Sequence, residues 1–392
     1  MSFFGKDKTL FKLFGLPIKA NLSWLLLVAL IMVSLAEAWF PRELGEDVTW
    51  QVHWGLAFIG TVGLFASLIA HELCHSLVAR KTGMPVSGIT LFVFGGVSQL
   101  EDEPPTAGSE FIMAVVGPLS SVVIGTIFLV AFFVIRSSAA SQQTIWATAG
   151  QALVKYLAII NFVLAAFNSL PAFPLDGGRV LRSIVWGLTD SLRLATRVAV
   201  SIGSMLGFGL MLLGILFFIW QPTIAGLWLV VIGFFLRHAA MQNLRLVTMR
   251  EYLEGETVDR FMTTDVVTVE RDAEVDAFVN DLVFHHRFTY YPVVDETGKL
   301  VGIVSARAPR ELDQSEWSRA TVEQIMDPVE EQKTLPPDAD AVDALSLLRK
   351  LDEGRVVVVE DGEPVGILSL RDLMGFLALK IDLEPSSSRL PG

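Results

Sequence analysis

The sequence predicts a polytopic α-helical membrane protein with about six transmembrane helices and a short β segment, followed by a cytoplasmic α+β region built from two repeats. Composition is the first reason: 52% of the 392 residues are hydrophobic, only 18% are charged, and the mean hydropathy is +0.53. These values exclude an ordinary soluble domain. Charge is the second reason, because residues 1–250 carry a net +4 and residues 251–392 a net −16. The acidic second region also argues against nucleic-acid binding.

Six apolar runs predict the transmembrane helices. They lie at about Ala20–Phe40, Gln51–Ala79, Phe111–Ile135, Thr144–Leu170, Leu194–Trp220 and Thr223–Leu236. Lysines precede the first run and arginines follow the last, whereas the loop Pro41–Asp47 holds one arginine against three acids. The positive-inside rule therefore places both termini in the cytoplasm. We expect a multi-pass protein of a cell membrane, from a prokaryote, with the lipid bilayer as a partner.

The second run contains the pattern H-E-x-x-H, in which His71 and His75 flank Glu72. On a helix the two histidines lie about 40° apart and one turn along, so both can reach one metal ion. Glu72 lies about 100° from His71, placed to act on the water at the metal rather than to ligate. A tetrahedral metal needs a third protein ligand, and the other histidines are poorly placed, which favours a carboxylate. The other histidines are His53, His238, His285 and His286.

Asp176 is the candidate carboxylate, in the segment Asn168-Ser-Leu-Pro-Ala-Phe-Pro-Leu-Asp176-Gly-Gly. This segment follows the fourth run on its cytoplasmic side, and His71–His75 lie near the cytoplasmic end of the second run. The two motifs can therefore lie at similar depth. The prolines and glycines break the helix and free backbone groups to line a polar pocket. An acid at membrane depth is costly unless it is paired or metal-bound, so the sequence predicts a metal site at His71, His75 and Asp176.

Val86–Leu100, between the second and third runs, is β-branched and aromatic and is interrupted by Gly95 and Gly96. This pattern predicts a short hairpin or a paired extended segment near the H-E-x-x-H helix. The edge of such a segment can bind an extended peptide by strand addition. The alternative is an interfacial loop that only packs against the helices.

Residues 256–382 contain two copies of one unit at an offset of 64, with Val258–Met262 matching Val322–Met326 and Gly302–Ser305 matching Gly366–Ser369. Each copy reads as strand, helix, strand, strand, helix, and tandem copies with this ending resemble a pair of CBS domains. We expect a membrane domain at 1–250, a tandem pair at 251–383 with copies at 256–312 and 320–382, and a disordered Pro/Ser-rich tail at 384–392.

The paired motifs together resemble the site-2 protease family of intramembrane zinc metalloproteases, and the C-terminal pair resembles the subgroup that carries CBS domains. The resemblance implies hydrolysis of a peptide bond within or beside a substrate's transmembrane segment. It implies one Zn²⁺ per chain held by His71, His75 and Asp176, with Glu72 moving the proton. Asn168 would then hydrogen-bond the substrate backbone or the oxyanion.

Substrate binding is implied on the same basis, with the segment around Gly95 and Gly96 holding the unwound substrate extended. The family's substrates include anti-sigma factors, membrane-tethered transcription regulators and signal-peptide remnants. All of these are membrane proteins or parts of them, so we expect a membrane-protein substrate.

The CBS pair implies regulation by ATP or another adenine nucleotide. Ser369 and Asp372 match the family's phosphate- and ribose-contacting positions, and Thr334 is a weaker match to another contact position. The first copy has Ala308 where the aspartate would stand. The alternative is a dimerisation or docking module without a ligand, and a homodimer through the pair is a further expectation.

Two other functions compete with proteolysis. The first is a CBS-regulated membrane transporter or channel, which should show polar residues in several runs or repeated halves. Here the polar residues concentrate in two motifs, and the membrane half shows no repeat. The second is an inactive zinc-binding scaffold, against which the retained Glu72 counts.

Overall fold

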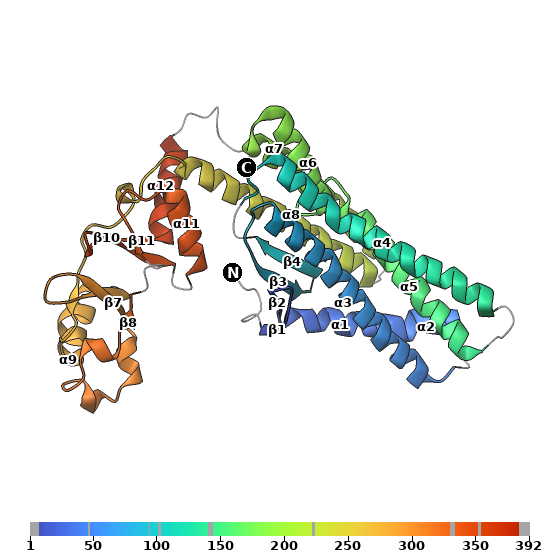
Figure 1. Cartoon of the computed structure of the whole chain (residues 1–392), viewed down its shortest axis with the longest axis horizontal. Helices are drawn as coiled ribbons and strands as arrows, with labels where there is room; N and C mark the ends of the chain where they lie inside the picture. The colour runs from blue at the N-terminus through green and yellow to red at the C-terminus, as the bar shows by residue number, and fades with distance from the viewer. Residues whose placement is uncertain are drawn as a thin grey trace. The chain divides into compact units, whose positions relative to one another are not determined.

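The computed structural model describes residues 8–45, 48–93, 95–100, 103–139, 144–221, 224–329, 334–351 and 354–383. The chain forms two compact units, Met1–Val247 and Thr248–Gly392 (Figure 1). The first unit holds the predicted apolar runs and the second holds the two repeats. The tail expected at 384–392 lies outside the described residues.

Six helices in the described part of the chain are long and apolar enough to cross a membrane. They are α1 with its continuation through η1 and α2 (Ser23–Leu44), α3 (Trp50–Lys81), α4 (Ala107–Ala139), α5 (Ile145–Asn168), α7 (Leu192–Trp220) and α8 (Ile224–Leu253). Large apolar side chains remain exposed along them, for example Phe217 at 49% and Ile219 at 74%. A water-soluble protein would bury such a surface, whereas lipid covers it at no cost. The prediction of about six transmembrane helices is confirmed.

Three helices of the first unit meet around the predicted metal site. α4 packs against α3, and it also packs against α6 (Asp176–Thr189), a short amphipathic helix between the fourth and fifth spans. The buried side of α6 carries Gly177, Gly178, Arg182 and Ser183. The arrangement brings the first residue of α6 toward the histidine-bearing part of α3.

A four-stranded sheet lies beside α3, in the order β1 (Lys8–Leu13), β2 (Leu16–Ala20), β3 (Val86–Phe92), β4 (Gly95–Leu100) (Figure 1). β3 and β4 form the expected antiparallel hairpin, while β2 and β3 are parallel. β4 is an edge strand of this sheet as described. The sequence analysis did not anticipate the β1–β2 hairpin, whose buried Ile18 and Ala20 add to the core around Phe65 of α3.

The second unit contains the two repeats as two sheets. The first copy has β5 (Val269–Glu270), a helical segment at Val275–His286 (α9, η3, α10), β6 (Tyr290–Val294) and β7 (Leu300–Ser305). The second has β9 (Thr334–Leu335), α11 (Ala341–Lys350), β10 (Arg355–Glu360), β11 (Glu363–Ser369) and α12 (Leu370–Leu383).

The predicted final helix forms only in the second copy. In the first copy it is replaced by the short 3₁₀ turns Ala308–Glu311 and Gln314–Glu316. The first of these turns ends at Leu312, whose extended backbone conformation cannot continue a helix. In the second copy the Ser369 amide and hydroxyl both donate to Asp372 Oδ2, at 2.9 and 2.5 Å, and cap α12.

Each copy supplies a segment to the sheet of the other. Thr263, near the start of the first copy, exchanges backbone hydrogen bonds with Ile367 of β11. The strand β8 (Asp327–Pro328), near the start of the second copy, pairs with β7. A Cβ on Gly366 would lie 2.4 Å from the Met262 sulfur, which explains a glycine at this repeated position. The two matched motifs of the repeat thus contact each other across the copies.

Candidate metal centre

His71, His75 and Asp176 converge on one point. The Nε2 atoms of the two histidines are 3.2 Å apart, and each lies 3.1 Å from Asp176 Oδ2. The histidines are 1% and 6% exposed. Ligands of a tetrahedral zinc with bonds of about 2.0–2.1 Å stand about 3.3 Å from one another, so two imidazole nitrogens and one carboxylate oxygen fit this ion.

The loop before α6 fixes the position of Asp176. The Phe173 amide donates to the Ala199 carbonyl of α7 at 3.3 Å. A Cβ on Gly177 would lie 2.3 Å from the Ser169 carbonyl oxygen, and one on Gly178 would lie 2.4 Å from the backbone of the same loop. The two glycines therefore let the first turn of α6 pack directly on the loop, which brings Asp176 to the histidines.

The two histidines lower the pKa of the Asp176 carboxyl. Burial alone would raise the pKa of its carboxyl. The charge on His75 and hydrogen bonds from both imidazoles outweigh burial and hold this pKa well below its usual range. An ionised carboxylate is the state that ligates a metal.

One face of α4 orients both imidazoles. The Met113 carbonyl accepts a hydrogen bond from His75 Nδ1 at 2.7 Å, and the Ser121 hydroxyl lies 2.9 Å from His71 Nδ1. Between them Gly117 leaves room for the His75 ring, since a Cβ there would lie 2.0 Å from Nε2. These positions are four residues apart. Because Nδ1 of each ring contacts α4, Nε2 of each ring faces the metal position.

The sequence analysis did not identify Met113, Gly117 or Ser121 as site residues. Met113 acts through its backbone carbonyl, which no residue type reveals. Gly117 and Ser121 are small residues in an apolar run, and their one signal is a spacing that matches a helix face.

Glu72 lies against β4. The Ser98 hydroxyl donates to Glu72 Oε2 at 2.7 Å and lies 3.2 Å from the Glu72 carbonyl oxygen. A Cβ on Gly96 would come within 2.9 Å of Glu72 Cγ, so a glycine lets the strand approach this side chain. Gly95, at the start of β4, has a φ of +129° that favours glycine. The predicted Gly95 and Gly96 thus lie where the strand meets Glu72, and Ser98 is an additional contact.

Asn168 ends α5, at the start of the loop that leads to Asp176. It is partly buried, and its Nδ2 donates to the Leu164 carbonyl of its own helix at 3.1 Å. In this structure Asn168 therefore borders the site without bonding to the three converging side chains among the contacts described.

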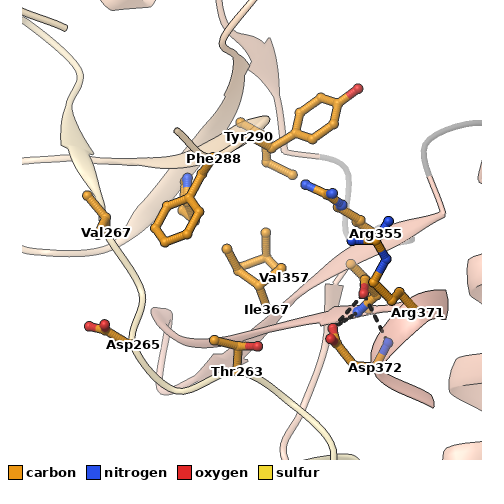
Figure 2. Close-up of a pocket in the computed structure, with 14 residues that line it drawn as sticks. Thr263, Asp265, Val267, Phe288, Tyr290, Arg355, Val357, Ile367, Arg371 and Asp372 are labelled. Atoms are coloured by element: carbon orange, nitrogen blue, oxygen red, sulfur yellow. Dashed lines mark hydrogen bonds between the residues drawn. The ribbon is translucent and has the colours of Figure 1, made fainter. Parts of the chain in front are cut away.

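A cavity of about 240 Å³ lies between the two copies in the second unit. Figure 2 shows Arg355, Arg371 and Asp372 at one end and Asp265 and Val267 at the other. The lining also includes Thr263, Phe288, Tyr290, Pro292, Ile303, Val356, Val357, Ile367 and Ser369. Ser369 and Asp372 are thus at the cavity, as the sequence predicted. Thr334 is not among its lining residues and lies on β9, paired with Val357.

Comparison with known proteins identifies both units. The sequence matches Peptidase family M50 over residues 59–143 and 135–214, and the CBS domain over residues 258–308 and 322–379. A zinc-metalloprotease relative from Synechocystis sp. is 32% identical over 361 residues, which are 91% of each chain. The chain belongs to peptidase family M50. It is a multi-pass membrane metalloprotease of the site-2 protease type that carries a CBS-domain pair.

One further relative agrees with this assignment. Zinc metalloprotease MJ0392 of Methanocaldococcus jannaschii is 31% identical to this M50 peptidase over 381 residues, covering 96% of this chain and 98% of the relative. The solved site-2 protease from the same organism is 28% identical, covers 60% of this chain and 94% of its own, and superposes with a TM-score of 0.41. The resemblance deduced from the motifs is confirmed, and a metalloprotease is favoured over the transporter or channel.

Proposed function

We propose that this M50 peptidase is a zinc-dependent endopeptidase that cleaves a membrane-protein substrate within or beside a transmembrane segment. The observation that carries the proposal is the convergence of His71, His75 and Asp176 beside Glu72 on a membrane-spanning helix. In this proposal residues 1–250 form the protease domain and residues 251–383 a regulatory domain. Both termini are cytoplasmic, so cleavage occurs near the cytoplasmic face.

His71, His75 and Asp176 would hold the zinc ion. Bound zinc supplies a Lewis acid that polarises the scissile carbonyl and acidifies water. Glu72 takes a proton from the attacking water and passes it to the leaving amine. The Ser98 hydroxyl, 2.7 Å from Glu72 Oε2, holds that carboxylate in place. Asn168 donates to the substrate backbone or to the oxyanion that forms on it.

The substrate is extended when it is cut. A transmembrane helix hides its carbonyls in internal hydrogen bonds, so the segment must unwind before hydrolysis. The edge strand β4 passes Glu72 at Gly96 and offers backbone groups for strand addition. Substrates of this kind include anti-sigma factors, tethered transcription regulators and signal-peptide remnants. Gly96→Pro removes one backbone N–H, and we expect impaired cleavage with normal zinc content; normal cleavage would contradict pairing at β4.

The decisive experiment measures zinc content and cleavage of a model single-pass substrate in Glu72→Gln. We expect zinc to be retained and cleavage to fall by about 10²–10⁴-fold, the usual contribution of a general base. Glu37→Gln, an exposed change of the same type in the first span, is the matched control and should cleave normally. Equal cleavage in Glu72→Gln and wild type would overturn the protease assignment and favour the inactive scaffold.

Regulation by an adenine nucleotide is the second part of the proposal. The cavity between the copies combines the aromatic side chains of Phe288 and Tyr290 with two arginines and Asp372. Such a lining suits a nucleotide, with the aromatic rings against the base, Asp372 at the ribose hydroxyls and the arginines at the phosphates. ATP or a related nucleotide bound there would regulate the protease, and a homodimer through the pair would be compatible with this role.

Equilibrium dialysis of the full chain with ATP, AMP and S-adenosylmethionine tests this part. We expect one adenine nucleotide to bind, with weaker binding in Asp372→Asn. Asp338→Asn, at an exposed position outside the cavity lining, is the matched control and should bind normally. Absence of binding by all three compounds would favour the ligand-free dimerisation or docking module.

A further inference from the structure

A buried ion pair joins α6 to α4. Arg182 is 3% exposed and Glu110 is fully buried. Arg182 Nε donates to Glu110 Oε1 at 2.7 Å, and another guanidinium nitrogen donates to Glu103 Oε2 at 3.2 Å. Its guanidinium also lies over the Phe173 ring, 5.1 Å from the ring centre. One side chain therefore contacts a helix and a loop from elsewhere in the chain.

Arg182 and its contact Phe173 lie on opposite sides of Asp176 in the sequence. Arg182 follows Asp176 by six residues on α6, about 9 Å along the helix axis. Phe173 precedes Asp176 by three residues in the loop that leads to α6. Because Arg182 holds the loop on one side and the helix on the other, the position of Asp176 depends on what Arg182 is bound to. That anchor is Glu110.

Glu110 lies on the helix that orients the histidines. It precedes Met113 by one turn of α4, and Gly117 and Ser121 continue along the same face. This face binds His75 Nδ1 through Met113 and His71 Nδ1 through Ser121. α4 therefore contributes to the position of all three converging side chains. It hydrogen-bonds both histidines directly and reaches Asp176 through Glu110 and Arg182.

Burial of the two charges makes the packing of α6 on α4 sensitive to substitution of Arg182 or Glu110. Two charged groups withdrawn from water are costly to bury, and removing Arg182 would leave Glu110 buried without its partner. Glu110 Oε2 is buried and has no hydrogen-bond partner among the described residues, so Arg182 supplies the hydrogen bonds seen at this carboxylate. Loss of Arg182 would release α6 from Glu110 of α4, and loss of Glu110 would leave Arg182 only its contacts to Glu103 and Phe173 in the described part of the chain.

We propose that Arg182 and Glu110 are positioning residues that set Asp176 at the metal site by locking α6 onto α4. The inference rests on the ligand set of the proposed function. Neither residue touches the metal position, so their effect passes through Asp176. Partners that orient metal ligands affect metal affinity about 10–100-fold when they are changed.

Zinc affinity of the purified full chain, measured by competition with a chromophoric chelator, is the test. We expect Arg182→Gln and Glu110→Gln to weaken zinc binding about 10–100-fold and to change the visible spectrum of the Co²⁺-substituted protein. Arg182→Lys keeps the positive charge but lacks the several donors of a guanidinium. Its zinc affinity should lie between that of the two Gln variants and that of wild type.

Lys155→Gln is the matched control. It breaks another ion pair of the same unit, in which Lys155 Nζ lies 2.7 Å from Glu43 Oε1 and over the Trp39 ring. This pair joins α5 to α2 and has no contact with α6 among the described residues. Zinc affinity and the Co²⁺ spectrum should match wild type. If Arg182→Gln lowers thermal stability but keeps both wild-type values, the pair is structural only and the inference fails.

A double-mutant cycle with Asp176→Ala separates positioning from general damage. If Arg182 acts through Asp176, adding Arg182→Gln to Asp176→Ala should weaken zinc binding no further. A full additional loss would overturn the inference. An unchanged affinity in Asp176→Ala alone would overturn the ligand set and this inference with it. A wild-type chain that binds zinc but cleaves nothing would instead overturn the proposed protease function alone.

Discussion

The metal centre in the membrane unit and the cavity in the second unit are built in opposite ways. At the metal centre the candidate ligand atoms already stand 3.1–3.2 Å apart, and neighbouring groups fix each ring and the carboxylate. The cavity holds about 240 Å³, and its Asp372 is engaged in capping α12. At the first site three atoms converge on one point, whereas at the second the groups that would contact a ligand are spread along a cavity. Changes should therefore be nearly all-or-none at the first site and graded at the second.

Gly117→Ala should have the largest effect, and it tests whether the metal centre is as tightly fixed as the comparison requires. The new methyl group would lie 2.0 Å from His75 Nε2, so the ring must leave the metal position. We expect zinc content and cleavage to fall to background. Gly209→Ala on α7, where no atom lies within 4 Å of the added Cβ, is the control and should retain both. Normal zinc content in Gly117→Ala would show that the centre can adapt.

Ser98→Ala should have a smaller effect, on turnover rather than on metal content. It removes the 2.7 Å hydrogen bond to Glu72 Oε2 and leaves the three ligands in place. We expect kcat to fall about 10–100-fold with zinc unchanged, and Ser98→Thr to recover part of the loss. Ser137→Ala, at the exposed end of α4, serves as the control. Unaltered kcat in Ser98→Ala would mean that Glu72 holds its orientation unaided.

Arg371→Gln tests the prediction for the cavity of the second unit. If each lining group contacts a different part of the ligand, removing one group should weaken the binding of that part alone. Removing one exposed guanidinium should weaken ATP binding about tenfold and leave adenosine binding unchanged. Arg319→Gln, outside the cavity, should bind both normally. Isothermal calorimetry measures the affinities. An equal loss for ATP and adenosine would place the phosphates away from Arg371.

Thr297→Val should have the smallest effect, on the pH dependence of stability in the second unit. The Thr297 hydroxyl and the Lys299 amide donate to Asp295 and hold the pKa of this carboxyl below its usual range. A lowered folded-state pKa stabilises the protein above the unfolded value of about 3.9, and this contribution is lost as the pH falls through the folded value. The melting temperature should drop slightly at pH 7, and the difference from wild type should vanish in strong acid. A difference independent of pH would contradict this cause.

The sequence predicted the features that depend on residue type at a helical or membrane-length spacing. These are the six apolar runs, the pair His71 and His75, and the acid Asp176 beside its glycines. It did not predict the groups that hold them. Met113 contributes a carbonyl, Ser98 and Ser121 are small polar residues that occur anywhere, and Arg182 and Glu110 lie 72 residues apart in the chain. Only tertiary structure brings such groups together.

The fold was predictable to a similar degree. The hairpin at Val86–Leu100 has a β-branched and aromatic pattern and formed as expected. The β1–β2 hairpin is short and lysine-rich, and its strands are stabilised by pairing with a distant segment rather than by their own pattern. In the first CBS copy the backbone becomes extended at Leu312 and ends the turn Ala308–Glu311, which the repeat pattern did not predict.

The parallel pairing of β2 with β3 has a consequence for biogenesis. Ile18 lies opposite Ile89 and Ala20 opposite Leu91, yet the first two membrane-spanning helices separate these strands in the chain. Strands that share hydrogen bonds must be on one side of the bilayer, so the chain between them crosses it an even number of times. The sheet can close only after both helices are inserted, and β4, which binds Glu72, joins on β3. A nascent chain therefore can pair β2 with β3 only once its first helical hairpin spans the membrane.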